Sequence, residues 1–142
     1  VAEVAQTHDV SEEAACLYLQ LLALPNPSDK KLREFNGWTP KTLKDAGKAL
    51  VAAKLVMQAK RARAGRELFL PCGWEDLKRP NGPIETWKLP LFGVRRTHEG
   101  KLDIPLGLIL PVRPMHVLFA QAWGRTLKGD APRYEEAKRR RR

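Results

Sequence analysis

Two helix start signals, with a helix stop between them, constrain the fold of this chain more than any other feature. Ser28 and Thr39 each offer a hydroxyl that can accept an N–H left unpaired in the first turn of a helix. The residue after Thr39 is proline, which suits the first helical position because its missing N–H costs nothing there. Between the two signals, Gly37 can adopt the left-handed conformation that ends a helix and turns the chain. The sequence therefore predicts two short helices, over about 28–36 and 40–53, joined by a tight turn.

The helix predicted over 40–53 has an apolar side and a charged side. Spacings of three and four place one set of residues on a buried stripe, namely Leu43, Ala46, Leu50 and Ala53. The opposite side carries Lys41, Thr42, Lys44, Asp45 and Lys48. A solvated lysine face is the ordinary interpretation of this pattern, and contact with a polyanion is the other. Asp45 fits either, since it can pair with a neighbouring lysine, face solvent, or accept a hydrogen bond from a cytosine amino group.

A basic hairpin is predicted to follow this helix. Two β-prone runs, 55–59 and 67–71, flank a short basic stretch, and Ala64-Gly65 can supply a tight turn between them. The basic residues of this hairpin are Lys60, Arg61, Arg63 and Arg66. Four like charges on one hairpin repel each other and add little to folding, so an anionic partner would offset their repulsion.

This order of elements, a helix pair with a tight turn and then a basic hairpin, resembles a winged helix-turn-helix over about the first eighty residues. Residues 11–24 would be the opening helix, with Ser11 as its cap. That helix is apolar nearly all round, so it is either the central core helix or buries a second face against the C-terminal part of the chain. The resemblance implies an α+β, mainly helical fold with a two-stranded wing. It also implies a winged helix-turn-helix domain over 1–79, followed by an extension over 80–142.

The resemblance further implies double-stranded DNA as the partner. In such proteins the second helix of the pair enters the major groove, and the wing contacts the phosphate backbone or the minor groove. The positions implied at the DNA are Thr39, Lys41, Thr42, Lys44, Lys48, Lys60, Arg61, Arg63 and Arg66. Two other functions remain open: a winged helix that binds protein within a larger complex, and an accessory DNA-binding domain of a nucleic-acid enzyme. The chain begins without Met, so we expect a piece of a larger transcription regulator or DNA-processing protein.

The charge distribution agrees with a nucleic-acid partner. The chain has a net charge of +10, and its first 27 residues hold four acidic residues and no Lys or Arg. Residues 39–66, in contrast, hold eight basic residues against Asp45 alone. The other concentration is the tail 138–142, which we expect to be disordered and either to bind phosphates nonspecifically or to keep the chain soluble.

The second half is rich in Pro and Gly, which excludes long regular elements over most of 80–114. It is nevertheless too apolar for a linker, so we expect extended segments that cover a surface. A strand is predicted over 106–112, paired with 87–94, and a short helical turn over 73–78. A helix is predicted over 114–128, with a broad apolar face that packs on the chain's own core, on a second copy, or on another domain.

Catalytic, metal and cofactor chemistry is not expected. Cys16 and Cys72 are not spaced for metal binding, and the three histidines lie far apart in the sequence. The polar cluster over 95–103 is interpreted as a solvated turn, and 124–129 lacks the ending of a phosphate-binding P-loop. Two cysteines without a secretory signal indicate a reducing, cytoplasmic setting, and no stretch is apolar enough to span a membrane. We therefore expect a DNA-binding protein rather than an enzyme.

Overall fold

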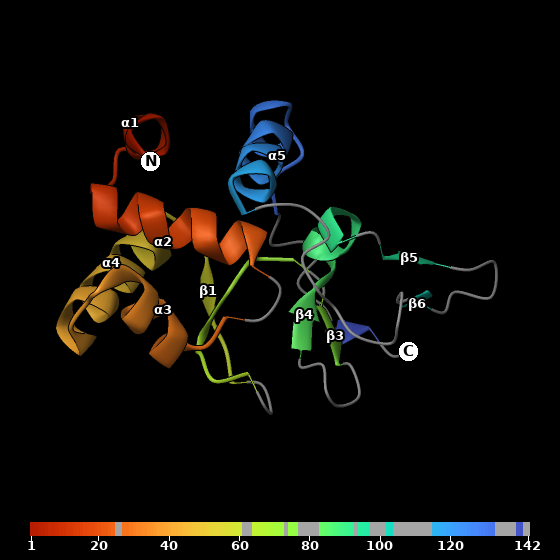
Figure 1. Cartoon of the computed structure of the whole chain (residues 1–142), viewed down its shortest axis with the longest axis horizontal. Helices are drawn as coiled ribbons and strands as arrows, with labels where there is room; N and C mark the ends of the chain where they lie inside the picture. Colours follow the sequence, from red (N-terminus) through yellow and green to blue (C-terminus); the bar gives the residue numbers. More distant parts are fainter. Residues whose placement is uncertain are drawn as a thin grey trace.

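A computed structural model of the chain describes residues 1–24, 27–60, 64–72, 74–76, 83–92, 94–96, 102–103, 115–132 and 139–140. Its fold is α+β and mostly helical (Figure 1), which confirms the coarse class expected from the sequence. The helices are α1 (Ala2–His8), α2 (Glu12–Ala23), α3 (Asp29–Asn36), α4 (Pro40–Ala52), the 3-10 helix η1 (Thr86–Phe92) and α5 (Met115–Leu127). The strands are β1 (Met57–Gln58), β2 (Leu68–Phe69), β3 (Trp74–Asp76), β4 (Pro83–Glu85), β5 (Arg95–Arg96), β6 (Leu102–Asp103) and β7 (Arg139–Arg140).

The local start and stop signals act as expected. The hydroxyl oxygens of Ser11, Ser28 and Thr39 each accept a backbone N–H three residues further on, at 3.1, 3.2 and 3.2 Å. Gly37 ends α3 in the left-handed conformation, with φ 68° and ψ 32°. The three predicted helices therefore agree with α2, α3 and α4 to within one residue at each end. Helix α1 was not expected, because a seven-residue helix with Val4 as its buried residue has little periodicity to detect.

The hairpin after α4 also has the predicted strand positions. β1 and β2 pair antiparallel with Met57 opposite Phe69 and Gln58 opposite Leu68, and the Ala59 N–H extends the ladder to the Glu67 carbonyl at 2.9 Å. On the returning side, Gly65 has φ 69°, and its carbonyl accepts the Asp29 N–H at 2.9 Å. The base of the hairpin is thus attached to the start of α3.

Two predictions for the second half are wrong. Residues 74–76 are a strand rather than a helical turn, because they pair antiparallel with β4, where Trp74 lies opposite Glu85. Residues 86–92 are a 3-10 helix rather than a strand, since buried residues crowd the segment without alternating between two faces. The strand predicted over 106–112 lies outside the described residues. In the tail, β7 pairs parallel with β3, where disorder was expected.

Helix α2 lies between α4 on one side and α5 on the other (Figure 1). Its buried residues spread around the helix, as the nearly all-apolar sequence predicted: Ala14, Ala15, Leu17, Tyr18, Gln20, Leu21, Leu22 and Ala23. Helix α2 is therefore central in the core and also buries a second face against the C-terminal part of the chain, so the two alternatives expected for it are found together.

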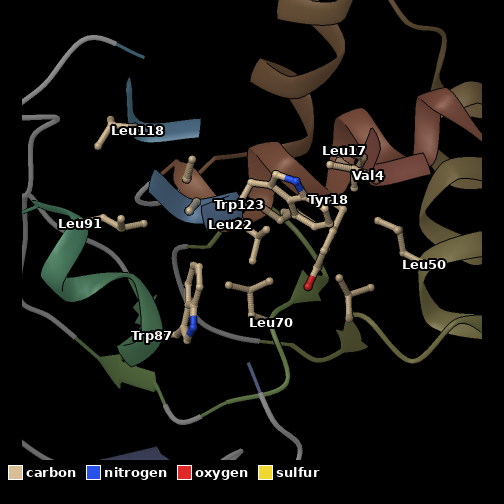
Figure 2. Packing of buried hydrophobic residues seen from close by; sticks show 14 of the residues in the cluster. Val4, Leu17, Tyr18, Leu22, Leu50, Leu70, Trp87, Leu91, Leu118 and Trp123 are labelled. Carbon is tan, nitrogen blue, oxygen red and sulfur yellow. The ribbon is translucent and has the colours of Figure 1, made fainter. Parts of the chain in front are cut away.

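The core joins the N-terminal helices to the second half of the chain. Figure 2 shows Trp123 of α5 near Tyr18 and Leu22 of α2, with Trp87 and Leu70 nearby, and all five belong to one buried cluster. The apolar face of α5 thus packs on the chain's own core. This was one of the three packing partners predicted for it, the others being a second copy and another domain. Among the described residues, no helix combines the length and apolarity that a membrane crossing needs.

Candidate nucleic-acid interface

The outer face of α4 carries a row of lysines. Lys41, Lys44 and Lys48, named here the lysine row, are exposed, and Asp45 is exposed among them. The buried side consists of Leu43, Ala46, Gly47 and Leu50, which packs toward α2. The two sides of the helix therefore fall as the periodicity predicted. Ala53 departs from the prediction and is exposed, because the helix ends at Ala52.

The two threonines at the start of α4 stabilise the helix end. The Thr39 hydroxyl oxygen accepts the Thr42 N–H at 3.2 Å, and the two side-chain oxygens lie 3.0 Å apart. Both hydroxyls thus have a partner inside the protein, although a hydroxyl oxygen can take part in a further hydrogen bond. Thr39 is exposed and Thr42 half-buried, so a contact of either with a ligand is compatible with the cap.

The basic residues of the hairpin have different environments. Lys60 is exposed where the hairpin leaves β1, whereas Arg61 and Arg63 lie outside the described residues. Arg66 is 4 % exposed, so the expectation that it contacts DNA is wrong. The Arg66 guanidinium donates to Glu85 Oε1 at 2.7 Å, to the Pro27 carbonyl at 3.1 Å and to the Leu68 carbonyl at 3.0 Å.

Arg66 belongs to a buried charged cluster with Glu85 and Lys88. Glu85 Oε2 accepts the Leu70 N–H at 3.1 Å, and Lys88 Nζ lies 3.4 Å from Glu85 Oε1. Lys88 also donates to the Leu24 carbonyl at 2.7 Å, which satisfies an acceptor at the end of α2. The cluster therefore connects α2, the hairpin and β4 in the interior, as a structural element rather than a part of the surface.

The ionisation of this cluster follows from burial and neighbouring charges. Burial alone would raise the pKa of Glu85, but Lys88, Arg66 and the Leu70 N–H together hold this pKa below its ordinary value. Burial lowers the pKa of Lys88 to about 8, although the Glu85 carboxylate favours the charged ammonium. The sequence analysis did not identify Glu85 and Lys88. The signal that could have found them is a Glu and a Lys three residues apart within an apolar stretch, where charged side chains are seldom buried without a partner.

A groove of about 430 Å³ runs between α3, α4 and the hairpin. Leu43 and Leu68 provide apolar lining, and Lys44 and Lys48 of the lysine row line it from α4. A Cβ placed on Gly47 would lie 2.8 Å from Leu68 Cδ1, so the missing side chain allows α4 and β2 to approach closely. The groove thus lies beside the lysine row, between the helix and the hairpin.

Within the described ranges, no group of three or more His, Cys, Asp or Glu side chains could hold a metal ion. Neither Cys16 nor Cys72 forms a disulfide in the described part of the chain. Burial raises the pKa of Cys16, whose thiol donates to Asn36 Oδ1 at 3.7 Å. These contacts make Cys16 a packing residue between α2 and α3 rather than a nucleophile.

Comparison with protein-family models found no matching family, and comparisons with curated proteins and with solved structures found no match either.

Proposed function

We propose that this chain is a DNA-binding module of the winged helix-turn-helix type. In this proposal α4 enters the major groove, and the β1–β2 hairpin lies on the phosphate backbone or in the neighbouring minor groove. The observation that carries the proposal is the exposed lysine row on the second helix of the α3–α4 pair. That helix is the one that reads DNA in helix-turn-helix proteins.

The arrangement of α4 supports this role. Residues 37–39 separate α3 from α4, which is the length of turn found in helix-turn-helix motifs. The buried side of α4 packs toward α2, so the lysine row faces away from the core. A helix of 13 residues is about 20 Å long, and a major groove about 12 Å wide accepts a helix of this kind. The dimensions of α4 are therefore compatible with insertion into a major groove.

Electrostatics support a polyanionic partner. The lysine row and Lys60 contribute four exposed cations against Asp45 and Glu67, and like charges on one helix face do not stabilise the fold. If each of the four cations neutralises one phosphate, the slope of log K against log salt is about −3.6. The affinity for DNA would then fall about 150-fold between 50 and 200 mM salt.

Titration with generic duplex DNA, followed by fluorescence anisotropy at several salt concentrations, tests the proposal. We expect binding at low salt that weakens with a slope near −3.6 from the described lysines, and more steeply if Arg61 and Arg63 also contact phosphates. Replacing Arg61 and Arg63 by Ala should then weaken binding to every sequence and flatten the slope. No salt-dependent binding by the intact chain at low ionic strength would refute the DNA-binding function.

One observation favours a protein partner instead. Phe35 on α3 is 65 % exposed, which is unusual for a large aromatic side chain. A winged helix that binds protein could use this residue as an anchor, with the lysine row facing an acidic surface. The same titration separates the two functions, because a module that binds protein would lack the salt slope near −3.6 that four phosphate contacts produce.

A further inference from the structure

The groove between α3, α4 and the hairpin contains charges of both signs. Arg33, Lys44 and Lys48 line it with positive charge, and Asp29 and Glu67 line it with negative charge. Among the residues that the structure describes, none of these five side chains forms an ion pair with another. The opposite charges thus share one groove without satisfying each other.

Burial in this groove disfavours the charged form of Asp29. Its side chain is half-buried, and burial raises its pKa above the ordinary value even though Arg66 and Arg33 act in the other direction. Arg33 lies one turn further along α3, yet it forms no ion pair with Asp29 within the described part of the chain. An ammonium group in the groove would therefore gain a partly desolvated carboxylate as its partner.

The lining between the charges is apolar. Pro40 and Leu43 of α4 and Leu68 of β2 line the same groove. Its volume of about 430 Å³ falls in the range of about 300–1,000 Å³ that small-molecule sites occupy. A simple carboxylate would leave Asp29 and Glu67 unpaired, and a simple amine would leave the three cations unpaired. A zwitterion with an apolar body would satisfy both sets of charges.

We propose that this groove binds a free α-amino acid with an apolar side chain, and that the bound amino acid and DNA exclude each other. The ligand carboxylate would pair with Lys44, Lys48 and Arg33, its ammonium group with Asp29 and Glu67, and its side chain would cover the apolar lining. Exclusion follows because Lys44 and Lys48 would serve both ligands. This second half of the proposal depends on the proposed DNA-binding function, whereas binding of the amino acid does not.

Amide chemical shifts of the intact, 15N-labelled chain test the binding. The probes are L-phenylalanine and L-leucine, together with 3-phenylpropionate, which lacks the ammonium group, and 2-phenylethylamine, which lacks the carboxylate. We expect at least one of the amino acids to shift the amides of Gly47, Gln58 and Leu68, and both analogues to bind at least tenfold more weakly. Equal binding of either analogue, or no shift with both amino acids at 10 mM, would overturn the proposal.

Substitutions of single charged residues test which side chains pair with the bound amino acid. Glu67→Gln and Lys48→Gln should each weaken amino-acid binding at least tenfold, because each removes one of the charges that the zwitterion pairs with. Lys54→Gln is the control, since Lys54 is an exposed lysine that follows the same helix and lies outside the groove. If Glu67→Gln and Lys48→Gln both bind the amino acid as tightly as the unmodified chain and the Lys54→Gln control do, the site lies elsewhere and the proposal fails.

The exclusion of DNA is measured separately. The apparent affinity for duplex DNA should fall at least fivefold when L-phenylalanine or L-leucine saturates the groove, and 3-phenylpropionate at the same concentration should have no such effect. Amino-acid binding without this fall would overturn the exclusion. A chain that binds the amino acid but no DNA in any condition would refute the proposed function and leave the groove assignment standing.

Discussion

Replacing Glu85 by Gln should destabilise the fold strongly, although the two side chains have nearly the same shape. Glu85 Oε1 accepts from Arg66, with Lys88 Nζ at 3.4 Å, and Oε2 accepts from the Leu70 N–H. An amide turns one of these oxygens into an NH2 group, which cannot accept a hydrogen bond. It also removes the negative charge between the side chains of Arg66 and Lys88, which are both buried.

The magnitude follows from the loss of a counterion in the interior. Removing one partner of a buried ion pair costs about 3–5 kcal/mol. In a chain of this length each kcal/mol corresponds to about 2–4 °C, so the midpoint of thermal unfolding should fall by about 6–20 °C. Lys88→Met should cost less than Glu85→Gln, because it leaves the pair of Arg66 with Glu85 intact.

Thermal and urea unfolding at pH 7, followed by circular dichroism, measure these differences. Glu34→Gln on the exposed side of α3 is the matched control, and its effect should lie within about 0.5 kcal/mol of zero. A loss below about 1 kcal/mol for Glu85→Gln would mean that solvent reaches Arg66 and Lys88. The reasoning from buried charge would then be refuted, and with it the exclusion of Arg66 from the surface.

Three further results are expected. Replacing the lysine row by Gln should lower DNA affinity at 50 mM salt and reduce the salt slope by about 2.7, as anisotropy titrations would show; an unchanged slope would remove α4 from the interface. Gly37→Ala should cost about 1–2 kcal/mol in urea unfolding, because Gly37 has φ 68° and the cost is conformational, with no atom within 4 Å of an added Cβ. The free energy of unfolding should rise between pH 8 and about 9, since the pKa of Lys88 is lowered to about 8 and the unfolded chain binds more protons in that window. Above about pH 9 the rise should weaken and then stop, because burial raises the pKa of Cys16 above its ordinary value and that of Tyr18 to about 12, and the unfolded chain then releases protons that the folded chain keeps. A flat profile from about pH 8 to 9 that Lys88→Met does not alter would contradict this assignment.

The parts of the fold that the sequence predicted depend on local chemistry. The caps at Ser28 and Thr39 and the turn at Gly37 act over three or four residues, so one sequence contains all the information they need. The apolar stripe of α4 also depends only on nearby residues, because it is defined by spacings of three and four along the helix. Its periodicity alone therefore places the lysines on the correct face of the helix.

The parts that failed depend on partners far away in the chain. Strand β3 forms because β4 pairs with it, and nothing within 73–78 specifies that pairing. The prediction that Arg66 lies at the surface failed because its counterion Glu85 lies 19 residues further on. The groove joins side chains of α3, α4 and the hairpin, so its combination of charges appears only once those elements have packed together.

The buried cluster around Arg66 decides where this chain can be cut. A fragment that ends near residue 79 would keep the helix pair and the hairpin, yet its Arg66 would lose Glu85 as a counterion. The face of α2 that α5 covers would also be open to solvent, with Leu22 and its neighbours exposed. A shortened expression product that retains the lysine row should therefore aggregate unless it also retains η1 and α5. The smallest unit that could carry out the proposed DNA binding is consequently larger than the helix pair and hairpin that would touch the DNA.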